Sequence, residues 1–415
     1  MSAEEIVLTL VGLLILGVIV VGASYADQYR SLRARAAVRG VLILGNALLV
    51  INGVGQVISA YSPSLQSGNP PAKADAWGAL IVSVVVAGLA TAVLYRPVTE
   101  RIAVLFPRFR GKTKIQLGAP SALEPELPES PPSGEPLFPQ MLNYYTTDAL
   151  MVPRAQPSIP VSDLDVQDDH QDNWVRGFNP ASMIHVLAVV YVLYLLGVQF
   201  ISFILGGGLS GVAETYQTQG LSGWDLIVNE LPFLVIPVLG VGLGLHRNLG
   251  QALKRLGLEL PDGQGILAAF GITIGLFIFV AIVSSLWMAL VPKDVYQEQT
   301  KASDALTNSV TTIGLAFLVA ATAAIGEEIA FRGALQPVLG FWPTAVIFAM
   351  THIQYALTPA WLIIFGVAVA FGWIRMRYNT TACMLTHFLY DFIPLALTVT
   401  VPQGTWMWIL RMLLK

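Results

Sequence analysis

Charged residues are rare in this sequence. Asp, Glu, Lys and Arg make up 12% of the 415 residues, whereas hydrophobic residues make up 55%. A typical soluble domain has about 25% charged residues, so this chain has about half of that charge. Several uncharged stretches reach the roughly 20 residues that a helix needs to cross the hydrocarbon core of a bilayer. The composition therefore predicts a polytopic membrane protein and excludes an ordinary soluble domain.

Cysteine is almost absent. Cys383 is the only one, so the chain cannot form an intrachain disulfide, and its cysteine usage does not indicate a redox compartment. A basic segment ahead of the first apolar run is also lacking, since the sequence begins MSAEE. No cleavage site of small residues follows that run, so we interpret it as a retained first span rather than a signal peptide.

The chain contains many long apolar windows. Ten of them predict membrane-spanning helices, at residues 6–23, 41–61, 77–95, 181–205, 226–245, 266–290, 310–331, 341–357, 360–374 and 382–401. The expected fold class is all-α, a polytopic transmembrane helical bundle of about ten spans. The tail at residues 406–415 is too short to cross, so we expect it at the membrane interface or against the bundle.

Basic residues gather in loops that alternate along the chain. These loops are RSLRARAAVRG at 30–40, RPVTERIAVLFPRFRGKTK at 96–114, HRNLGQALKR at 246–255 and IRMRY at 374–378. Lys and Arg favour cytoplasmic loops, so the pattern predicts an outside N-terminus and places these four loops in the cytoplasm. The expected location is an integral, multi-pass position in a membrane, the cell membrane if the source is prokaryotic.

Residues 97–180 interrupt the apolar pattern. After a basic start, the segment is rich in Pro, Glu and Ser and then acidic, as in VSDLDVQDDHQDN at 161–173. Low hydrophobicity and many prolines do not offset the entropy lost when a chain is ordered, so we expect a disordered cytoplasmic linker. The predicted domains are a three-span unit at 1–96, this linker at 97–180, and a larger transmembrane domain at 181–415.

Ionisable groups inside spans are costly and usually mark function. We expect Glu230 and His185, which lie in earlier spans, to have packing or interfacial roles. The others concentrate in the last four predicted spans, as Glu327, Glu328, Arg332, His352, His387 and Asp391.

Helical spacing separates the two adjacent glutamates. Residues four apart share a face, so Glu328 and Arg332 are predicted to pair and neutralise each other near the cytoplasmic end of their span. Glu327 is turned by about 100° from Glu328 and cannot share that arginine equally, which leaves it able to accept a proton. The same spacing applies to two further pairs, His387 with Asp391 and Phe348 with His352.

Three helices that offer such groups around one cavity favour water activation. A glutamate removed from water is a stronger general base, a neutral imidazole can orient or share its proton, and a second imidazole with its neighbour can donate to a developing oxyanion. This arrangement predicts a hydrolase. In a membrane its natural substrate is a peptide bond of a membrane-associated protein or peptide.

Three short motifs add a family resemblance. EEIAFR at 327–332, FAMTH at 348–352 and HFLYD at 387–391 resemble the EExxxR, FxxxH and HxxxN/D motifs of the CPBP family, which includes CAAX prenyl protease 2 and bacterial Abi-like proteins. The motifs occur in the family's order, and the resemblance covers roughly residues 181–400. It implies a CPBP-type intramembrane endopeptidase, with prenylated CAAX-type proteins among the candidate substrates.

The resemblance also implies roles for single residues. By motif position Glu327 is the catalytic glutamate, His352 helps to activate the water, and His387 with Asp391 stabilises the oxyanion. Supporting positions are taken by Glu328, Arg332 and Phe348. The last motif residue is often Asn, and an ionised Asp cannot donate a hydrogen bond. Asp391 therefore either stays protonated or orients and charges His387.

Metal dependence is left open by the family, which has been described both as metalloproteases and as metal-independent glutamate proteases. The HExxH motif of zincins is absent here, and one carboxylate with two histidines would need support from a second shell. We expect no cofactor, and keep as the alternative a zinc ion held by Glu327, His352 and His387.

Other functions stay open at this point. The same bundle can be a non-catalytic membrane scaffold or a regulatory or immunity protein, with the charges at 327–332 forming a network at a helix end and His352 bonding a neighbouring helix. A transporter is disfavoured because we find no inverted repeat. The expected partners are the lipid bilayer and a membrane-associated protein or peptide substrate, with no nucleic acid.

Overall fold

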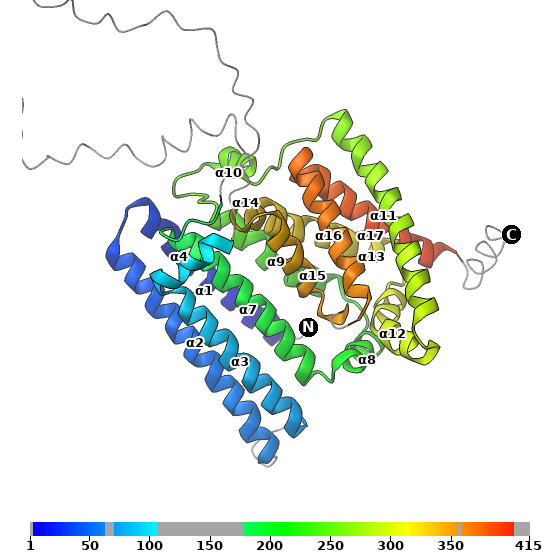
Figure 1. Cartoon of the computed structure of the whole chain (residues 1–415), viewed down its shortest axis with the longest axis horizontal. Coiled ribbons are helices and arrows are strands. Elements are labelled where there is room, and N and C mark those ends of the chain that lie inside the picture. The colour runs from blue at the N-terminus through cyan, green and yellow to red at the C-terminus, as the bar shows by residue number, and fades with distance from the viewer. Residues whose placement is uncertain (1–2, 63–69, 106–176, 356–357, 402–415) are drawn as a thin grey trace, which may run out of the picture. The chain divides into compact units, whose positions relative to one another are not determined.

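The computed structural model describes residues 3–62, 70–105, 177–355 and 358–401. Over these ranges the chain forms helices joined by turns, with no β-strand, and the predicted all-α class is confirmed (Figure 1). Residues 97–105 of the predicted linker belong to a helix, α4 (Arg96–Leu105). Most of the predicted linker and the apolar tail at 406–415 lie outside the described residues.

Nine helical stretches in the described part of the chain are long and apolar enough to cross a membrane. The protein is therefore an integral, multi-pass membrane protein, while its orientation stays a prediction. Eight of these stretches are single helices: α1 (Ala3–Gln28), α2 (Leu32–Tyr61), α3 (Lys73–Val93), α7 (Met183–Leu205), α9 (Gly223–Gly240), α11 (Gly263–Leu290), α16 (Ala360–Arg377) and α17 (Thr380–Thr400). The ninth combines α13 (Ile313–Glu327), the π-helix η3 (Glu328–Leu335) and α14 (Gln336–Leu339).

Shorter helices connect the spans. They are α8 (Gly208–Gln219), α10 (Leu249–Arg255), α12 (Lys293–Ser309), α15 (Phe341–Thr351) and the short 3₁₀ turn η4 (Ile353–Tyr355). Helix starts follow from polar side chains that accept a hydrogen bond from the first turn, where the backbone N–H groups lack an intrahelical partner. Such caps are Ser31 for α2, Ser182 for α7, Asn248 for α10, Asp262 for α11, Thr312 for α13 and Asn379 for α17.

One predicted span is wrong. Residues 341–357 do not form a full crossing, because α15 has 11 residues and is only about 17 Å long at 1.5 Å per residue, against a hydrocarbon core of roughly 30 Å. The helix ends at His352, whose φ of −88° and ψ of 62° are not helical. The apolar pattern continues past this point, so hydropathy alone could not reveal the turn.

The predicted fifth span is also shorter than expected. It was predicted over 226–245, but α9 ends at Gly240. Gly242 and Gly244 follow with φ values of 90° and 78°, in the left-handed region that glycine adopts without steric cost. The chain therefore leaves the helix and turns towards α10.

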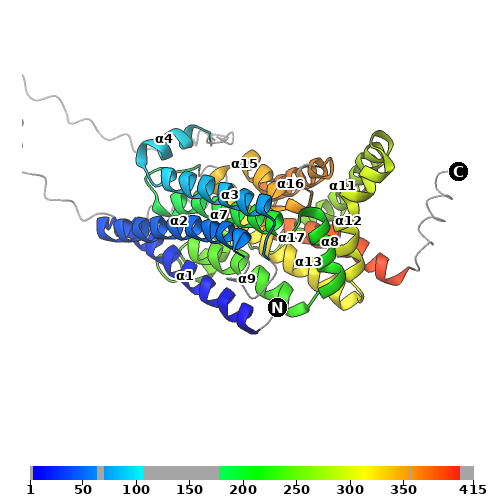
Figure 2. The same ribbon diagram turned by 90° about the horizontal axis from the view of Figure 1, so that it is seen from below.

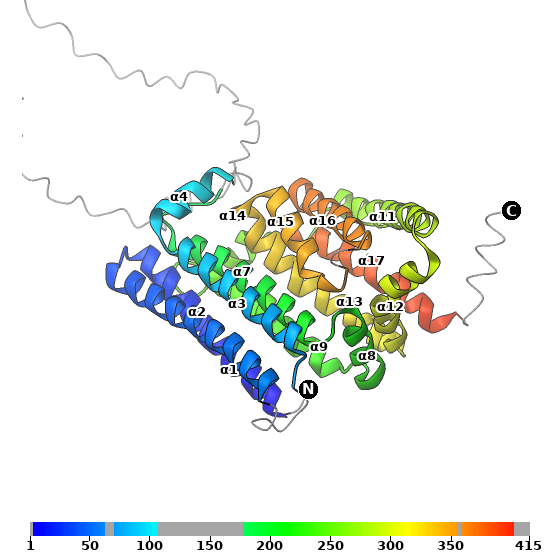
Figure 3. The same ribbon diagram turned by 60° about the horizontal axis from the view of Figure 1, so that its bottom comes forward.

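The N-terminal helices and the later ones pack into one compact unit. Helices α2, α3 and α7 run side by side (Figure 3), and α1 lies along α9 (Figure 2). On the other side of α9, helices α13, α15, α16 and α17 pack on one another, with α11 against α16 and α17. The domain boundaries expected from the sequence stay a prediction.

Asp27, at the end of α1, joins the N-terminal helices to the start of α7. Its Oδ1 accepts the backbone N–H of Met183 at 2.7 Å and its Oδ2 accepts that of Ile184 at 3.0 Å. The hydroxyl of Ser182 donates to the same Oδ2 at 2.7 Å, and Arg35 forms an ion pair with Oδ1 at 3.1 Å. One carboxylate thus satisfies two backbone donors of another helix.

A second polar contact lies farther along the same helices. The Asn46 amide of α2 donates to Thr91 of α3 at 2.7 Å, and the Tyr194 hydroxyl of α7 donates to the amide oxygen of Asn46. Because hydrogen bonds between apolar helices fix their register, this contact aligns α2, α3 and α7.

Replacing Asp27 by Ala is expected to lower the free energy of unfolding by about 1–2 kcal/mol, because it leaves backbone donors of α7 without their acceptor. Asp27→Asn, which keeps one acceptor oxygen, is expected to lose less. Thermal unfolding of the full chain in detergent measures both. Asp294→Ala, at an exposed first-turn position of α12, is the control and should change little. Equal losses for all three variants would contradict the anchoring role of Asp27.

Candidate active site

The first motif lies at a change of helix type. The α-helical part of this span ends at Glu327, and Glu328 begins the π-helix η3, in which every residue except Ala334 is buried. π-helical turns are rare and often occur at functional sites. The sequence analysis assumed a regular α-helix here, and the structure corrects that assumption.

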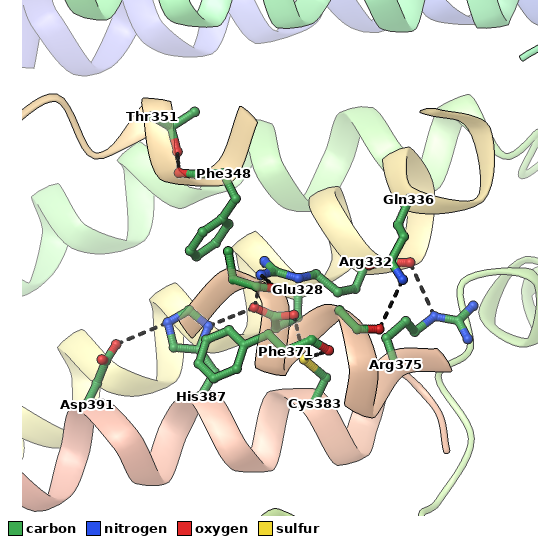
Figure 4. Close-up of polar contacts among 12 residues, drawn as sticks. Glu328, Arg332, Gln336, Phe348, Thr351, Phe371, Arg375, Cys383, His387 and Asp391 are labelled. Carbon is green, nitrogen blue, oxygen red and sulfur yellow. Dashed lines mark hydrogen bonds and ion pairs between the residues drawn. The ribbon is translucent and has the colours of Figure 1, made fainter. Parts of the chain in front are cut away.

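Glu328 is the centre of a buried polar network, shown in Figure 4. Arg332 Nη1 donates to Glu328 Oε1 at 3.1 Å, which confirms the predicted pair. His387 Nδ1 lies 2.9 Å from the same oxygen, and the Cys383 thiol donates to Oε2 at 2.8 Å. The side chains of Glu328 and Arg332 are 0% and 1% exposed. The pair therefore lies in the core between packed helices, and a surface charge network at a helix end is excluded.

Aromatic rings surround the arginine of this pair. The guanidinium carbon of Arg332 lies 4.0 Å from the centre of the Phe348 ring and 5.4 Å from that of Phe371. Its Nη2 also donates to the carbonyl of Ala368 at 3.4 Å. A cation over aromatic faces is stabilised, most strongly when it is removed from water. Arg332 thereby ties the π-helix to α15 and α16, while the supporting role expected for Phe348 stays a prediction.

Two more side chains donate hydrogen bonds to backbone carbonyls in this region. Arg375 Nε donates to the carbonyl of Arg332 at 3.2 Å, and the Gln336 amide donates to the carbonyl of Gly372 at 3.1 Å (Figure 4). Helical turns with displaced hydrogen bonds leave carbonyl groups that need donors, and Arg375 supplies one. These contacts hold α16 against the π-helix and the start of α14.

His387 lies between two carboxylates. Its Nδ1 contacts Glu328, and its Nε2 lies 3.2 Å from Asp391 Oδ2. The predicted neighbours His387 and Asp391 are thus in contact. A carboxylate only accepts hydrogen bonds, so both ring nitrogens donate when both carboxyl groups are ionised. Asp391 is the more exposed partner, at 27%.

His352, at the end of α15, has a different environment. Its Nδ1 lies 3.0 Å from the carbonyl oxygen of Phe348, and its ring lies 4.8 Å from the Phe348 ring, between centres. The predicted contact between these two residues is confirmed. Because a carbonyl accepts only, Nδ1 carries the proton of a neutral ring and Nε2 is then the nitrogen that can accept one.

Glu327 lies within electrostatic reach of both histidines. Other charged groups that act on it include those of Glu328 and Asp391. Its Oε2 is buried, with no hydrogen-bond partner in the described part of the chain. Buried carboxylate oxygens are normally satisfied, so this one is available for a ligand. The structure thus brings all four predicted catalytic side chains to one place.

Several members of this network were not predicted. From the sequence, Cys383 has no predicted role in a site. Arg375 is predicted only as part of a basic loop. Cys383 lies four residues before His387, on the same helical face, so that spacing was a usable signal. The role of Arg375 depends on a backbone carbonyl of another helix, for which the sequence holds no signal.

For zinc to bind the alternative set of Glu327, His352 and His387, the His387 ring would have to release one of its carboxylate contacts. Zinc needs a free lone pair on each imidazole ligand, yet both nitrogens of His387 lie within hydrogen-bond distance of carboxylates. Among the described residues, no group of three His, Cys, Asp or Glu side chains is placed to hold one metal ion.

Removing Arg332 is expected to be strongly destabilising, because it leaves a buried carboxylate without its main counter-charge. For Arg332→Met we expect a loss of about 3–5 kcal/mol in the free energy of unfolding. The double variant Glu328→Gln/Arg332→Met removes both charges and should recover part of that loss. Thermal unfolding in detergent measures this cycle. Additive effects of the two substitutions would contradict the pairing.

A comparison with known families bears on this site. Residues 309–393 match the family model described as type II CAAX prenyl endopeptidase Rce1-like. The matched stretch contains the three motifs and runs from the end of α12 into α17, while the N-terminal helices lie outside it. Neither the curated proteins nor the solved structures yielded a match. The resemblance to CPBP-type intramembrane proteases, expected from the motifs over roughly residues 181–400, is therefore confirmed for residues 309–393.

Proposed function

We propose that this protein is an intramembrane endopeptidase in which Glu327 and His352 activate a water molecule for attack on a peptide bond. The observation that carries the proposal is the placement of Glu327. It lies within electrostatic reach of the histidines of two other helices and has a buried oxygen with no hydrogen-bond partner among the described residues, whereas the adjacent Glu328 is fully engaged.

The first step is a proton transfer from water. Glu327 accepts the proton as general base, and the oxygen of the water attacks the scissile carbonyl carbon. His352 helps by sharing that proton with Glu327 through its Nε2, which can accept because its Nδ1 is fixed on the carbonyl of Phe348. When the tetrahedral intermediate breaks the C–N bond, the proton passes to the leaving amine. The products are a carboxylic acid and an amine, with water as the only co-reactant.

Glu328 and Arg332 act indirectly in this scheme. Their ion pair fixes Nδ1 of His387 through Glu328 Oε1, and therefore sets the direction in which Nε2 points. A charge that is already fixed in place does not have to reorganise during the reaction, which is the main benefit of a preorganised site.

His387 is the proposed donor to the oxyanion, and Asp391 orients it. In the structure, Nε2 contacts Asp391, so the N–H must be shared with the oxyanion or turn towards it when substrate binds. Hydrogen bonds in a substrate-free site often tighten or change only in the complex. Of the two roles considered for Asp391, this contact supports orientation and charging of His387.

The proposed mechanism is metal-independent, because the engaged nitrogens of His387 do not suit a zinc ligand. The proposed substrate is a membrane-associated protein or peptide, and the matched family, described as CAAX prenyl endopeptidases, makes a prenylated CAAX-type protein the first to test.

Replacement of Glu327 by Gln is expected to lower kcat at least 100-fold, because the amide cannot take a proton from water. The full chain, purified in detergent, is assayed with a farnesylated peptide ending in a CAAX sequence and with the same peptide lacking the farnesyl group. Glu214→Gln, at an exposed position of α8, is the matched control and should retain full activity. Equal cleavage by wild type and Glu327→Gln would exclude Glu327 as the base. A wild-type protein that cleaves neither peptide would favour the scaffold alternative.

Asp391 variants test the oxyanion arrangement. Asp391→Asn is expected to keep kcat within about tenfold, since the amide oxygen still accepts from His387 and its NH₂ can donate to the oxyanion. Asp391→Ala removes the orienting contact and is expected to lower kcat by about 100-fold. Both are measured with the peptide that the wild type cleaves. An Asn variant as impaired as the Ala variant would mean that the negative charge, rather than the hydrogen bond, is required.

A further inference from the structure

Glu230 is a carboxylate that neither the motifs nor the matched residues include. It lies in α9, and the sequence analysis expected a packing or interfacial role for it. In the structure its Oε2 is buried and has no hydrogen-bond partner among the described residues. An oxygen that only packs against apolar neighbours would be destabilising, so this environment calls for a polar ligand.

The position of Glu230 is set by a glycine. Gly326 directly precedes Glu327, and a Cβ atom on it would overlap Glu230 Oε2 and lie 3.4 Å from Phe233 Cβ. The missing side chain lets α9 approach α13 closely at this one level. Phe233 also stacks on Phe331 of the π-helix, with 6.0 Å between ring centres. The carboxyl group of Glu230 therefore lies against the chain at the residue before the proposed base.

Glu230 also faces the charged groups of the site. Glu327 of α13 and His387 of α17 both act on it electrostatically, and it acts in turn on the Tyr191 hydroxyl of α7. Glu230 therefore lies within electrostatic reach of the site and of α7.

Two buried carboxylate oxygens, Oε2 of Glu230 and Oε2 of Glu327, therefore lack partners in the described part of the chain, and the two carboxyl groups lie within electrostatic reach of each other. A water molecule has two O–H donors, and buried waters typically bridge polar groups that are otherwise unsatisfied. We propose that Glu230 is a further catalytic residue, which together with Glu327 holds the attacking water. This inference rests on the proposed function.

The two carboxyl groups then have different tasks. Glu327 takes one proton of the water, and Glu230 accepts a hydrogen bond from the other O–H, which points a lone pair of the oxygen at the scissile carbonyl. Correct orientation of a reactant can supply a large part of a rate enhancement. Glu230 itself gains and loses no proton in the net reaction.

The test compares Glu230→Gln, Glu230→Ala and Asn229→Ala in the full-length protein, assayed with the peptide that the wild type cleaves. Asn229 is the exposed neighbour on the same helix and serves as the matched control. We expect Glu230→Ala to lower kcat by about 10- to 100-fold with KM within about threefold, because the orienting acceptor acts on the water and not on the peptide. Glu230→Gln keeps an acceptor oxygen and should lose less. Asn229→Ala should match the wild type.

Several results would overturn this role. If Glu230→Ala retains wild-type kcat while Glu327→Gln is inactive, the proposed function stands and the role of Glu230 falls. If Glu230→Gln and Glu230→Ala lose kcat equally, with equal losses in thermal stability, Glu230 is structural.

A second measurement does not depend on any substrate. In an experimental structure that resolves water, one molecule should lie within about 3 Å of an oxygen of each carboxyl group. If the two carboxyl groups lie too far apart for one water to span, the inference is overturned, even where no test peptide is cleaved.

Discussion

The buried ion pair between Glu328 and Arg332 is the interaction on which the rest of this site depends. Burying a charge is costly unless it is paired and hydrogen-bonded, and here each partner has further contacts. Glu328 also binds His387 and Cys383, while Arg332 lies over aromatic rings and donates to a backbone carbonyl of α16. The requirement to satisfy these two charges brings η3, α15, α16 and α17 together at defined distances.

The same network explains why two adjacent glutamates differ in chemistry. Both carboxylate oxygens of Glu328 accept hydrogen bonds from neighbouring side chains. Glu328 is therefore a fixed structural charge that positions His387. Glu327 comes one residue earlier, where the α-helix changes to the π-helix, and one of its oxygens has no partner within the described ranges. In our proposal this difference separates the group that organises the site from the group that reacts. The carboxylate of Glu230 packs against Gly326, the residue before Glu327. In our proposal it extends the site to a helix outside the family motifs.

Much of this could be read in advance from local patterns. Apolar windows located the spans because a bilayer requires about 20 apolar residues, and spacings of four predicted three side-chain contacts that the structure contains. The errors have one common cause. Apolar composition predicts a full span over 341–357 and a regular α-helix over 327–332, because it does not distinguish an α-helix from a turn or a π-helix inside a packed bundle.

Local sequence patterns establish the class of the protein, its resemblance to the CPBP family and the polar side chains that the last spans carry. These follow from composition and spacing, which are local properties of the chain. Only the tertiary structure decided that Glu328 lies in a fully buried network with Cys383, that Arg375 reaches the carbonyl of Arg332, and that Glu230 comes to the residue before Glu327. The physical reason is that these contacts join helices far apart in the chain, and close packing, rather than sequence spacing, sets which side chains meet there.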